Sequence, residues 1–258
     1  MNRYGSLAVL LCAAALASCD YEKNAVQDIT GALPSARIKF FNFGVNAPGV
    51  NFYANDTKMT AIFTATGTEA TTGVVYGAVG AGGLYSGIAP GQYTLSGKIA
   101  AATDKDLAIS TLPATIADGK NYSFYQSGLY NSTTKTVDAF IVEDPFPAEI
   151  DYSAARVRFV NAIYNANSMT LYAKNVETGV ETVVGAAVAY KAAGAFTALP
   201  NGVYDLSTRY AGSATNAITR TAVSFVSGRV YTIGARGDIT VTSATATNRP
   251  FLDNTLNL

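Results

Sequence analysis

Hydrophobic and polar residues alternate with a period of two in several short segments of the chain. Residues 37–42 and 50–55 show this alternation most clearly, and it predicts half-buried strands. Pro90-Gly91 and Asn201-Gly202 each stand just before a Tyr-x-Leu run, which indicates a tight turn that enters a strand. After the N-terminal apolar run no segment sustains a helical period, and the Ala-rich residues 184–195 come nearest to one. The pattern therefore predicts an all-β protein.

The same set of signals occurs twice along the chain. ARIKFFNFGVNAPGVNFYA, which begins at Ala36, matches ARVRFVNAIYNANSMTLYA, which begins at Ala155, without a gap. Two shorter matches follow in the same order, and the first copy carries extra Thr-rich residues at 57–73, which we expect to form a longer loop or hairpin. The identical or similar pairs of the longest match are Arg37 and Arg156, Lys39 and Arg158, Phe40 and Phe159, Asn42 and Asn161, Asn46 and Asn165, and Tyr53 and Tyr172.

Each copy is predicted to fold as an antiparallel β-sandwich of immunoglobulin or transthyretin type. Short strands with turn signals must bury one face against a second sheet, and a sandwich is the economical solution. The expected domains are residues 35–147 and residues 148–258. The segment between the copies, EDPFPAEIDYSA, contains two prolines that mark a boundary.

The repeated motifs carry a resemblance to a known family. The order is Arg-[Ile/Val]-[Lys/Arg]-Phe-x-Asn, a turn containing Asn, a strand ending in Tyr-Ala, Pro-x-Gly-x-Tyr or Asn-Gly-x-Tyr, and Gly-[Lys/Arg]-x-Tyr. This order resembles the bacterial domain of unknown function 4397, here in two tandem copies. The resemblance implies secreted or lipid-anchored β-sandwiches without established catalytic residues. The turns at residues 46–49 and 165–168 depart from the pattern because they lack an acidic residue.

The N-terminus has the layout of a bacterial export signal. Arg3 precedes an apolar run at residues 7–17, and small residues lead to Cys19. The order LASC resembles a lipoprotein lipobox, so residues 1–18 are predicted to be a lipoprotein signal peptide and Cys19 to be lipidated. An ordinary secretory signal with a chance cysteine is the alternative. Residues 19–34 are polar and aperiodic, and we interpret them as a flexible tether.

The predicted anchor determines the expected location. The protein is expected outside the cytoplasm and bound to a membrane through its N-terminal lipid. Acidic residues just after the lipidated cysteine resemble a surface-export signal of Bacteroidota lipoproteins, whereas Asp20 alone resembles an inner-membrane retention signal of enteric bacteria. The outer membrane, on its periplasmic or surface-exposed side, is the favoured location.

Composition narrows the chemistry. The chain has no histidine, and its two cysteines are Cys12, inside the predicted signal peptide, and Cys19. Imidazole catalysis, His-ligated zinc and a cysteine nucleophile are therefore excluded from the mature body. The 18 basic and 18 acidic residues balance, so charge gives no case for binding nucleic acid. No catalytic residue, cofactor or metal is predicted.

Two local features resemble ligand-binding sites, but we interpret both as ordinary structural features. The acids of the segment between the copies could bind calcium or act as a hydrolase pair, but they are interpreted as solvated linker acids because their spacing fits no known loop. GAVGAGG at residues 77–83 lacks the lysine and helix of a phosphate loop, so its glycines are interpreted as turn residues. The four acids are Glu143, Asp144, Glu149 and Asp151.

Two pairs of equivalent side chains are the remaining candidates. Tyr53 and Tyr172 lie on the predicted non-core side of their strands. A large ring there can cover the other side of its sheet, dock one copy on the other or stack on a ligand, and docking is favoured. The paired bases at Arg37 and Lys39, and at Arg156 and Arg158, are interpreted as a solvated strand face that discourages edge pairing.

These observations lead to three functional hypotheses. The favoured one is a non-catalytic, lipid-anchored envelope protein for adhesion, scaffolding or envelope assembly. The first alternative is a glycan- or protein-binding lipoprotein that works beside an uptake system. The second alternative is a carboxylate-based hydrolase, which would require two buried acids that face a pocket.

Overall fold

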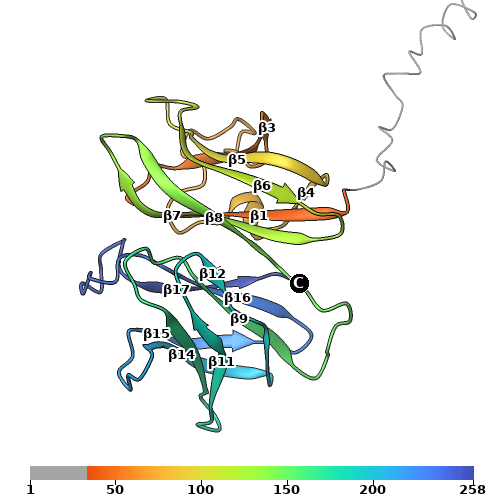
Figure 1. Cartoon of the computed structure of the whole chain (residues 1–258), viewed down its shortest axis with the longest axis vertical. Helices are drawn as coiled ribbons and strands as arrows, with labels where there is room; N and C mark the ends of the chain where they lie inside the picture. The colour runs from red at the N-terminus through yellow and green to blue at the C-terminus, as the bar shows by residue number, and fades with distance from the viewer. Residues whose placement is uncertain (1–33) are drawn as a thin grey trace, which may run out of the picture. The chain divides into compact units, whose positions relative to one another are not determined.

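Strands make up nearly all regular structure in residues 34–258, the part of the chain that the computed structural model describes (Figure 1). The predicted signal peptide, Cys19 and almost all of the predicted tether lie outside these residues. Within them, the only helical element is a 3-10 turn at Gly80–Gly83. No helix in this part of the chain is long and apolar enough to cross a membrane. The all-β prediction is confirmed.

The first copy forms two sheets, with strand orders β4-β1-β7-β8 and β3-β2-β5-β6. Residues alternate between the faces of each strand, so one side of each sheet supplies apolar side chains to a shared core. Ile38, Phe40, Phe52, Leu95 and Phe124 belong to that core. The strands are β1 (Ala36–Val45), β2 (Val50–Ala54), β3 (Thr57–Lys58), β4 (Ser86–Ile88), β5 (Gly91–Ile99), β6 (Ala108–Ile116), β7 (Asn121–Asn131) and β8 (Thr136–Glu143).

The second copy repeats this arrangement. Its sheets have the orders β12-β9-β16-β17, with β13 also pairing β9, and β11-β10-β14-β15. Val157, Phe159, Leu171, Leu206 and Ile233 belong to its core. The strands are β9 (Ala155–Asn161), β10 (Met169–Asn175), β11 (Glu181–Val188), β12 (Ala192–Ala193), β13 (Thr197–Leu199), β14 (Gly202–Tyr210), β15 (Ile218–Phe225), β16 (Val230–Arg236) and β17 (Phe251–Leu256).

One pair of strands in each copy differs from the antiparallel prediction. β1 pairs β7 in parallel, with Arg37 opposite Asn121, and β9 pairs β16 in parallel, with Arg156 opposite Val230. The chain crosses to the other sheet between the two strands of each pair, so a parallel neighbour is accessible without a hairpin. The register is the same in both copies, which makes the β1–β7 and β9–β16 pairs structurally equivalent.

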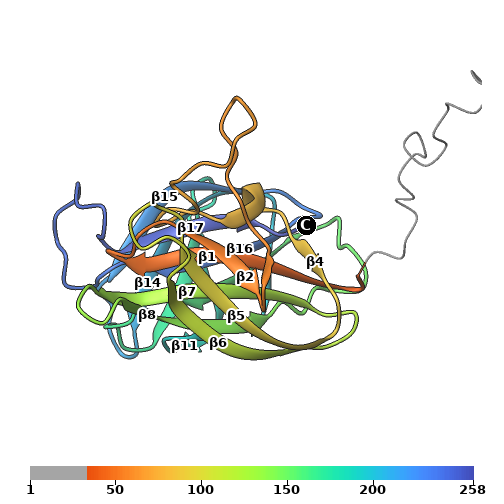
Figure 2. The same ribbon diagram turned by 90° about the horizontal axis from the view of Figure 1, so that it is seen from above.

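The local predictions for turns and loops agree with the structure. β5 begins at Gly91 and β14 at Gly202, directly after the predicted turns. Residues 59–85 contain no extended strand, and part of this segment projects as a loop (Figure 2). Isolated bridges join Phe63 to Glu69, Val74 to Val50 and Val79 to Phe41. The glycines of residues 77–83 are turn residues, and Gly82 and Gly83 have positive φ angles of 63° and 84°. Residues 184–195 form β11 and β12 and not a helix.

The prediction of half-buried strands is wrong for both segments on which it was made, β1 and β2, and all five residues of β2 are buried. Nine of the ten residues of β1 are buried, and only Arg37 is exposed. One face of β1 packs inside its own sandwich, and the other packs against the second copy through Phe41 and Phe43. A period of two identifies the strand but does not show that a second domain covers its outer face.

A fragment of residues 35–147 tests how much the packing of the second copy against β1 contributes to stability. We expect the fragment to keep its own core and to unfold cooperatively, because that core lies within the first copy. We also expect it to self-associate and to melt at a lower temperature than the full chain, because the aromatic rings on its outer face are no longer covered. Circular dichroism melts and light scattering would measure both effects. A monomeric fragment that melts with the full chain would contradict this.

Candidate functional site

The sheets that contain β1 and β9 face each other and are called the inner sheets; the other two are the outer sheets. An apolar cluster lies between the inner sheets. Phe41, Phe43, Tyr125 and Phe140 come from the first copy, and Val160 and Ala162 come from the second. The Tyr125 ring stacks on Phe41 and on Phe140, with centroid distances of 4.4 and 4.9 Å. Burying each such ring contributes about 1.5–3 kcal/mol, so this cluster supplies most of the affinity between the copies.

Large side chains of the first copy oppose small ones of the second. By strand register, Tyr125 and Gly234 occupy equivalent positions, as do Phe43 and Ala162. A Cβ atom built on Gly234 would lie 3.0 Å from Cε2 of Phe43, which is closer than ordinary packing. The absence of a side chain at Gly234 therefore lets the Phe43 ring approach the backbone of β16 without having to shift.

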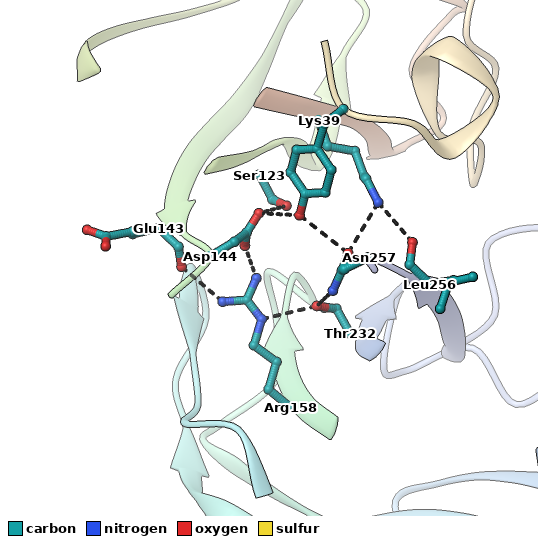
Figure 3. Close-up of polar contacts among 9 residues, drawn as sticks. Lys39, Ser123, Glu143, Asp144, Arg158, Thr232, Leu256 and Asn257 are labelled. Carbon is teal, nitrogen blue, oxygen red and sulfur yellow. Dashed lines mark hydrogen bonds and ion pairs between the residues drawn. The ribbon is translucent and has the colours of Figure 1, made fainter. Parts of the chain in front are cut away.

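A buried polar cluster borders the apolar one (Figure 3). Lys39 lies on the face of β1 that is turned away from its own core and toward the second copy, and it is only 1% exposed. Its Nζ donates hydrogen bonds to the carbonyl oxygen of Leu256 at 3.0 Å and to Oδ1 of Asn257 at 3.2 Å. Both acceptors belong to the second copy, so the cation of the first copy is satisfied across the interface.

Arg158 makes the reciprocal contact. It occupies the position on β9 that Lys39 occupies on β1, and it is also 1% exposed. Its Nη1 donates to the carbonyl oxygen of Glu143 at 2.9 Å, and its Nη2 forms an ion pair with Oδ1 of Asp144. Asp144 is itself buried. The cation of the second copy is therefore satisfied by the first.

The two sets of contacts are related by an approximate twofold symmetry. The pairing of Tyr122 with Glu143 corresponds to that of Tyr231 with Leu256, so Asp144 is the equivalent of Asn257. In each copy, one cation contacts the carbonyl oxygen of the last residue in the other copy's final strand and the side chain of the residue that follows it. A near-symmetric contact of this kind uses equivalent positions on both sides, as an isologous interface does.

Hydroxyl groups complete the polar cluster. Ser123 and Tyr85 donate to Oδ2 of Asp144 at 2.8 and 2.7 Å. Thr232, the equivalent of Ser123, accepts from Nε of Arg158 at 3.1 Å and from Nδ2 of Asn257 at 2.7 Å. The cluster therefore satisfies the charged groups of Lys39, Asp144 and Arg158, which a buried charge requires, whereas the buried hydroxyl of Tyr125 in the apolar cluster has no hydrogen-bond partner among the residues that the structure describes.

Burial shifts the acid–base properties of the cluster. The pKa of Lys39 is lowered to about 8. Burial is the largest cause, the nearby Arg158 charge acts in the same direction, and the Asp144 carboxylate opposes them. Burial also raises the pKa of the Tyr85 hydroxyl, and the Asp144 charge adds to this effect. The Lys39 ammonium lies 4.3 Å from the centre of the Tyr85 ring. At neutral pH the tyrosine is therefore a hydrogen-bond donor next to a cation that loses its proton readily.

The segment between the copies is part of this interface. Asp144 is buried in the ion pair with Arg158, and Phe146 packs between Tyr85 and Phe196, with ring centroids 5.7 and 6.2 Å away. The interpretation of this segment's acids as solvated is therefore wrong for Asp144. It misses the burial because linker acids are ordinarily exposed, and only the fold places this one against an arginine.

The other linker acids have separate partners. Glu143 pairs with Lys120, and Asp151 pairs with Arg156, in contacts of 2.9 and 3.1 Å that are partly exposed. Glu149 is exposed. Within residues 34–258 no group of three or more His, Cys, Asp or Glu residues is arranged to hold a metal ion.

The interpretation of the paired bases as a solvated face is also corrected. Arg37 is exposed and Arg156 is half-buried, whereas Lys39 and Arg158 are buried. In each strand the second base points toward the other copy because the copy covers that face. The signal available in the sequence was the pair of aromatics, Phe41 and Phe43, that continues the same face of β1.

Further contacts join the copies around the apolar cluster. The Arg236 guanidinium, which forms an ion pair with Asp253 of its own copy at 2.5 Å, lies 4.9 Å from the centre of the Tyr76 ring of the first copy. Ser127 donates to the carbonyl oxygen of Ala162 at 3.0 Å, and Lys191 forms an ion pair with Asp138. The interface therefore extends beyond the apolar cluster.

The predicted candidates Tyr53 and Tyr172 lie in the outer sheets. The Tyr53 ring is 4.4 Å from Nζ of Lys98, and the Tyr172 ring is 4.2 Å from Cζ of Arg209. Each cation belongs to the same copy as its tyrosine, and neither ring is in the cluster between the inner sheets. The shared tyrosine is explained by a shared cation–π contact within each copy. A role in ligand binding stays a prediction.

The outer sheet of the first copy carries two shallow hollows that share Asn55 and Thr94. Their volumes are about 300 and 610 Å³. Polar side chains line most of both, including Gln92, Ser96 and Lys98. The hypothesis of a glycan- or protein-binding surface stays a prediction, and this face is the place to examine it.

The fold and the interface define a protein of two β-sandwiches packed through their inner sheets. The model of the family described as "Domain of unknown function (DUF4397)" matches residues 36–172. This is more than half of the chain, so the protein belongs to that family. The match covers the whole first sandwich, β9 and the first part of β10.

Comparisons with other proteins give weaker likenesses. No curated protein matches the chain in sequence. A leucine-rich repeat protein from Bacteroides thetaiotaomicron VPI-5482 is similar at 11% identity and a TM-score of 0.22; the match covers 81% of this chain and 26% of that one, so this chain spans about a quarter of its length. A candidate cell adhesion protein from Bacteroides ovatus ATCC 8483 is similar at 11% identity and a TM-score of 0.24, with 88% and 99% of the chains covered.

The ion pair between Arg158 and Asp144 gives a direct test of the polar cluster. Arg158→Met should lower the free energy of unfolding by about 3–5 kcal/mol, because it leaves the Asp144 carboxylate buried without its cation. The free energy of unfolding should fall less in the double variant Arg158→Met with Asp144→Leu, because no charge is then left unpaired. Arg156→Met is the control, and its partly exposed pair should contribute at most about 1 kcal/mol. Denaturant unfolding of the full chain would measure all three, and equal losses for Arg156→Met and Arg158→Met would contradict the assignment.

Tyr172 gives a test that separates the outer sheet from the interface. Tyr172→Ala should lower the melting temperature by similar amounts in the full chain and in a fragment of residues 148–258, because the Arg209 contact lies within the second copy. Arg209→Ala should lower the melting temperature less when Tyr172→Ala is already present than it does in the wild type. A loss confined to the full chain would instead place the ring in the contact between the copies.

Proposed function

We propose that this protein is a non-catalytic, lipid-anchored component of the cell envelope, whose two sandwiches act as one rigid module in adhesion, scaffolding or envelope assembly. The observation that carries this proposal is the buried interface between the inner sheets. Both hydrogen-bond acceptors of Lys39 and the carboxylate partner of Arg158 belong to the other copy, so separating the copies would leave two cations without these partners. A rigid pair of domains suits a protein that holds a binding partner or a surface in position.

The tandem arrangement supports the same proposal. We infer that the second sandwich is a second copy of the family's domain, because it repeats the strand orders and the parallel register of the first. In this protein the interface between the copies uses the face that a single domain would leave in solvent. The outer sheets are left as the surfaces for partners.

The lipid anchor is inferred from residues 1–19. A tether of about 15 residues reaches at most about 50 Å when extended, which is enough to hold the two sandwiches clear of a membrane surface. Attachment at Cys19 would place the module on the extracytoplasmic side, with the outer membrane favoured. The module would then be presented to partners in the envelope or outside the cell.

Replacement of the predicted anchor tests this proposal. Cys19→Ala should move the protein from the detergent phase to the aqueous phase or leave it uncleaved, because the acylation site is lost. Cys12→Ala is the matched control: it removes the other cysteine, lies within the predicted signal peptide and should partition as the wild type does. Detergent-phase separation of cell extracts followed by immunoblotting would measure this.

The same variants test the proposed role in cells. In a strain that lacks the gene, wild type and Cys12→Ala should restore surface attachment and resistance of the envelope to detergent, and Cys19→Ala should restore neither. If Cys19→Ala partitions as a lipoprotein, the anchor is wrong. If deletion of the gene changes neither attachment nor envelope resistance, the proposed role is wrong.

A further inference from the structure

The two cation sites of the interface are equivalent in position but differ in chemistry. Arg158 faces the carboxylate of Asp144, whereas Lys39 faces the carboxamide of Asn257. A guanidinium next to a carboxylate forms an ion pair and nothing more, because arginine stays protonated. A lysine amine next to a carboxamide can react, because an uncharged amine is a nucleophile and a carboxamide has an electrophilic carbon.

The contacts of the Lys39 site place the amine beside the carboxamide with which it would react. Nζ of Lys39 lies 3.2 Å from Oδ1 of Asn257, and both side chains are buried. Nδ2 of Asn257 donates to Thr232 at 2.7 Å, which fixes the orientation of the carboxamide. Reacting groups held in contact and away from water gain a large effective concentration.

We propose that Lys39 and Asn257 form an isopeptide bond that joins the two sandwiches covalently. The lone pair of the uncharged Lys39 amine adds to Cγ of Asn257, and the electrons of the carbonyl double bond move to Oδ1. When the carbonyl re-forms, the bond from Cγ to Nδ2 breaks. Nδ2 leaves as ammonia after taking the proton that Nζ loses. The products are one amide and one ammonia, so no oxidant, nucleotide or other reactant is needed.

The residues around Lys39 affect how readily its amine loses a proton, which the reaction requires. The low pKa of Lys39 makes part of the amine uncharged near neutral pH. The groups that face it are Asp144, which opposes the loss of the proton, and Arg158 and the Tyr85 ring, with the Leu256 carbonyl as an acceptor.

Tyr85 is placed to stabilise the charge that forms on Asn257. Its hydroxyl lies 3.4 Å from Oδ1 of Asn257 and is held by Asp144 at 2.7 Å. The hydroxyl has one proton, which is shared between Oδ2 of Asp144 and Oδ1 of Asn257, and negative charge that develops on Oδ1 draws this proton toward Asn257. Tyr85 therefore acts on the reacting carbonyl, and Asp144 is a positioning residue that acts through Tyr85.

The bond would link the first strand of the first copy to the residue that follows the last strand of the second. It would close almost the whole described chain into one covalent loop. A cross-link over a long loop restricts the unfolded chain strongly, and it prevents the copies from separating under force. This inference concerns the chemistry of the interface and does not depend on the lipid anchor or on the proposed role in the envelope.

Peptide mapping of the full-length protein tests the proposal. Trypsin should release residues 38–58, uncut at Lys39, joined to residues 237–258. The mass should equal the sum of the two peptides less one ammonia, about 17 Da, and fragmentation should locate the junction at Lys39 and Asn257. Cleavage after Lys39, with residues 237–258 recovered at unmodified mass, would overturn the proposal, and this result needs no variant.

Lys39→Arg is the matched control, because the second copy already uses arginine at the equivalent position. It keeps a cation at the site but has no reactive amine, so the joined peptide should disappear, as it should in Asn257→Ala. On a denaturing gel, the wild type should migrate faster than Lys39→Arg because its chain is closed into a loop. Tyr85→Phe should reduce the joined fraction in freshly made protein, and an unchanged fraction would overturn the role of Tyr85.

Discussion

A buried cation must find hydrogen-bond acceptors within reach, and in this protein the other copy supplies both acceptors of Lys39 and, for Arg158, a carbonyl oxygen and the Asp144 carboxylate. Lys39 and Arg158 point away from the cores of their own sandwiches. Neither could be buried there unless the second copy supplied carbonyl and side-chain oxygens in the matching place. The position of one sandwich on the other is therefore fixed by polar groups that accept a limited set of distances and directions.

The polar cluster and the aromatic cluster have different roles. A buried ion pair returns little net stability, because removing its charges from water costs about as much as their attraction gains. The rings of Phe41, Phe43 and Tyr125 supply the favourable burial, but an apolar surface alone permits more than one alignment. We infer that the aromatic rings hold the copies together and that Lys39 and Arg158 select the register. The difference between Tyr125 and Gly234 then lets two related faces fit without clashing.

Local signals in the sequence are sufficient for the fold within each copy. Alternation identified the strands at residues 37–42 and 50–55, and Gly91 and Gly202 marked the turns, because those features depend on neighbouring residues only. The repeat also predicted that equivalent positions would share a role. Pairing direction was missed, because β1 and β7 are far apart in the chain and nothing local distinguishes a parallel neighbour.

The site was only partly accessible from the sequence. The bases at Lys39 and Arg158 were recognised as a pair, but they were assigned to solvent because the face that covers them belongs to another domain. Asp144 was interpreted as a solvated linker acid for the same reason. Asn257 carries no local signal at all, since its role follows from a register between β16 and β17 that places it opposite Lys39. The burial of polar residues at a domain interface is thus a property of the assembled fold.

If the interface governs stability, the two sandwiches form one cooperative unit. Differential scanning calorimetry of the full chain measures this cooperativity, because it compares the heat absorbed with the sharpness of the transition. We expect one transition in which the calorimetric and van't Hoff enthalpies agree. The same agreement should hold for Lys39→Arg, where no covalent bond can join the copies. Two resolved transitions in both proteins, or a calorimetric enthalpy about twice the van't Hoff value, would show instead that the copies unfold independently.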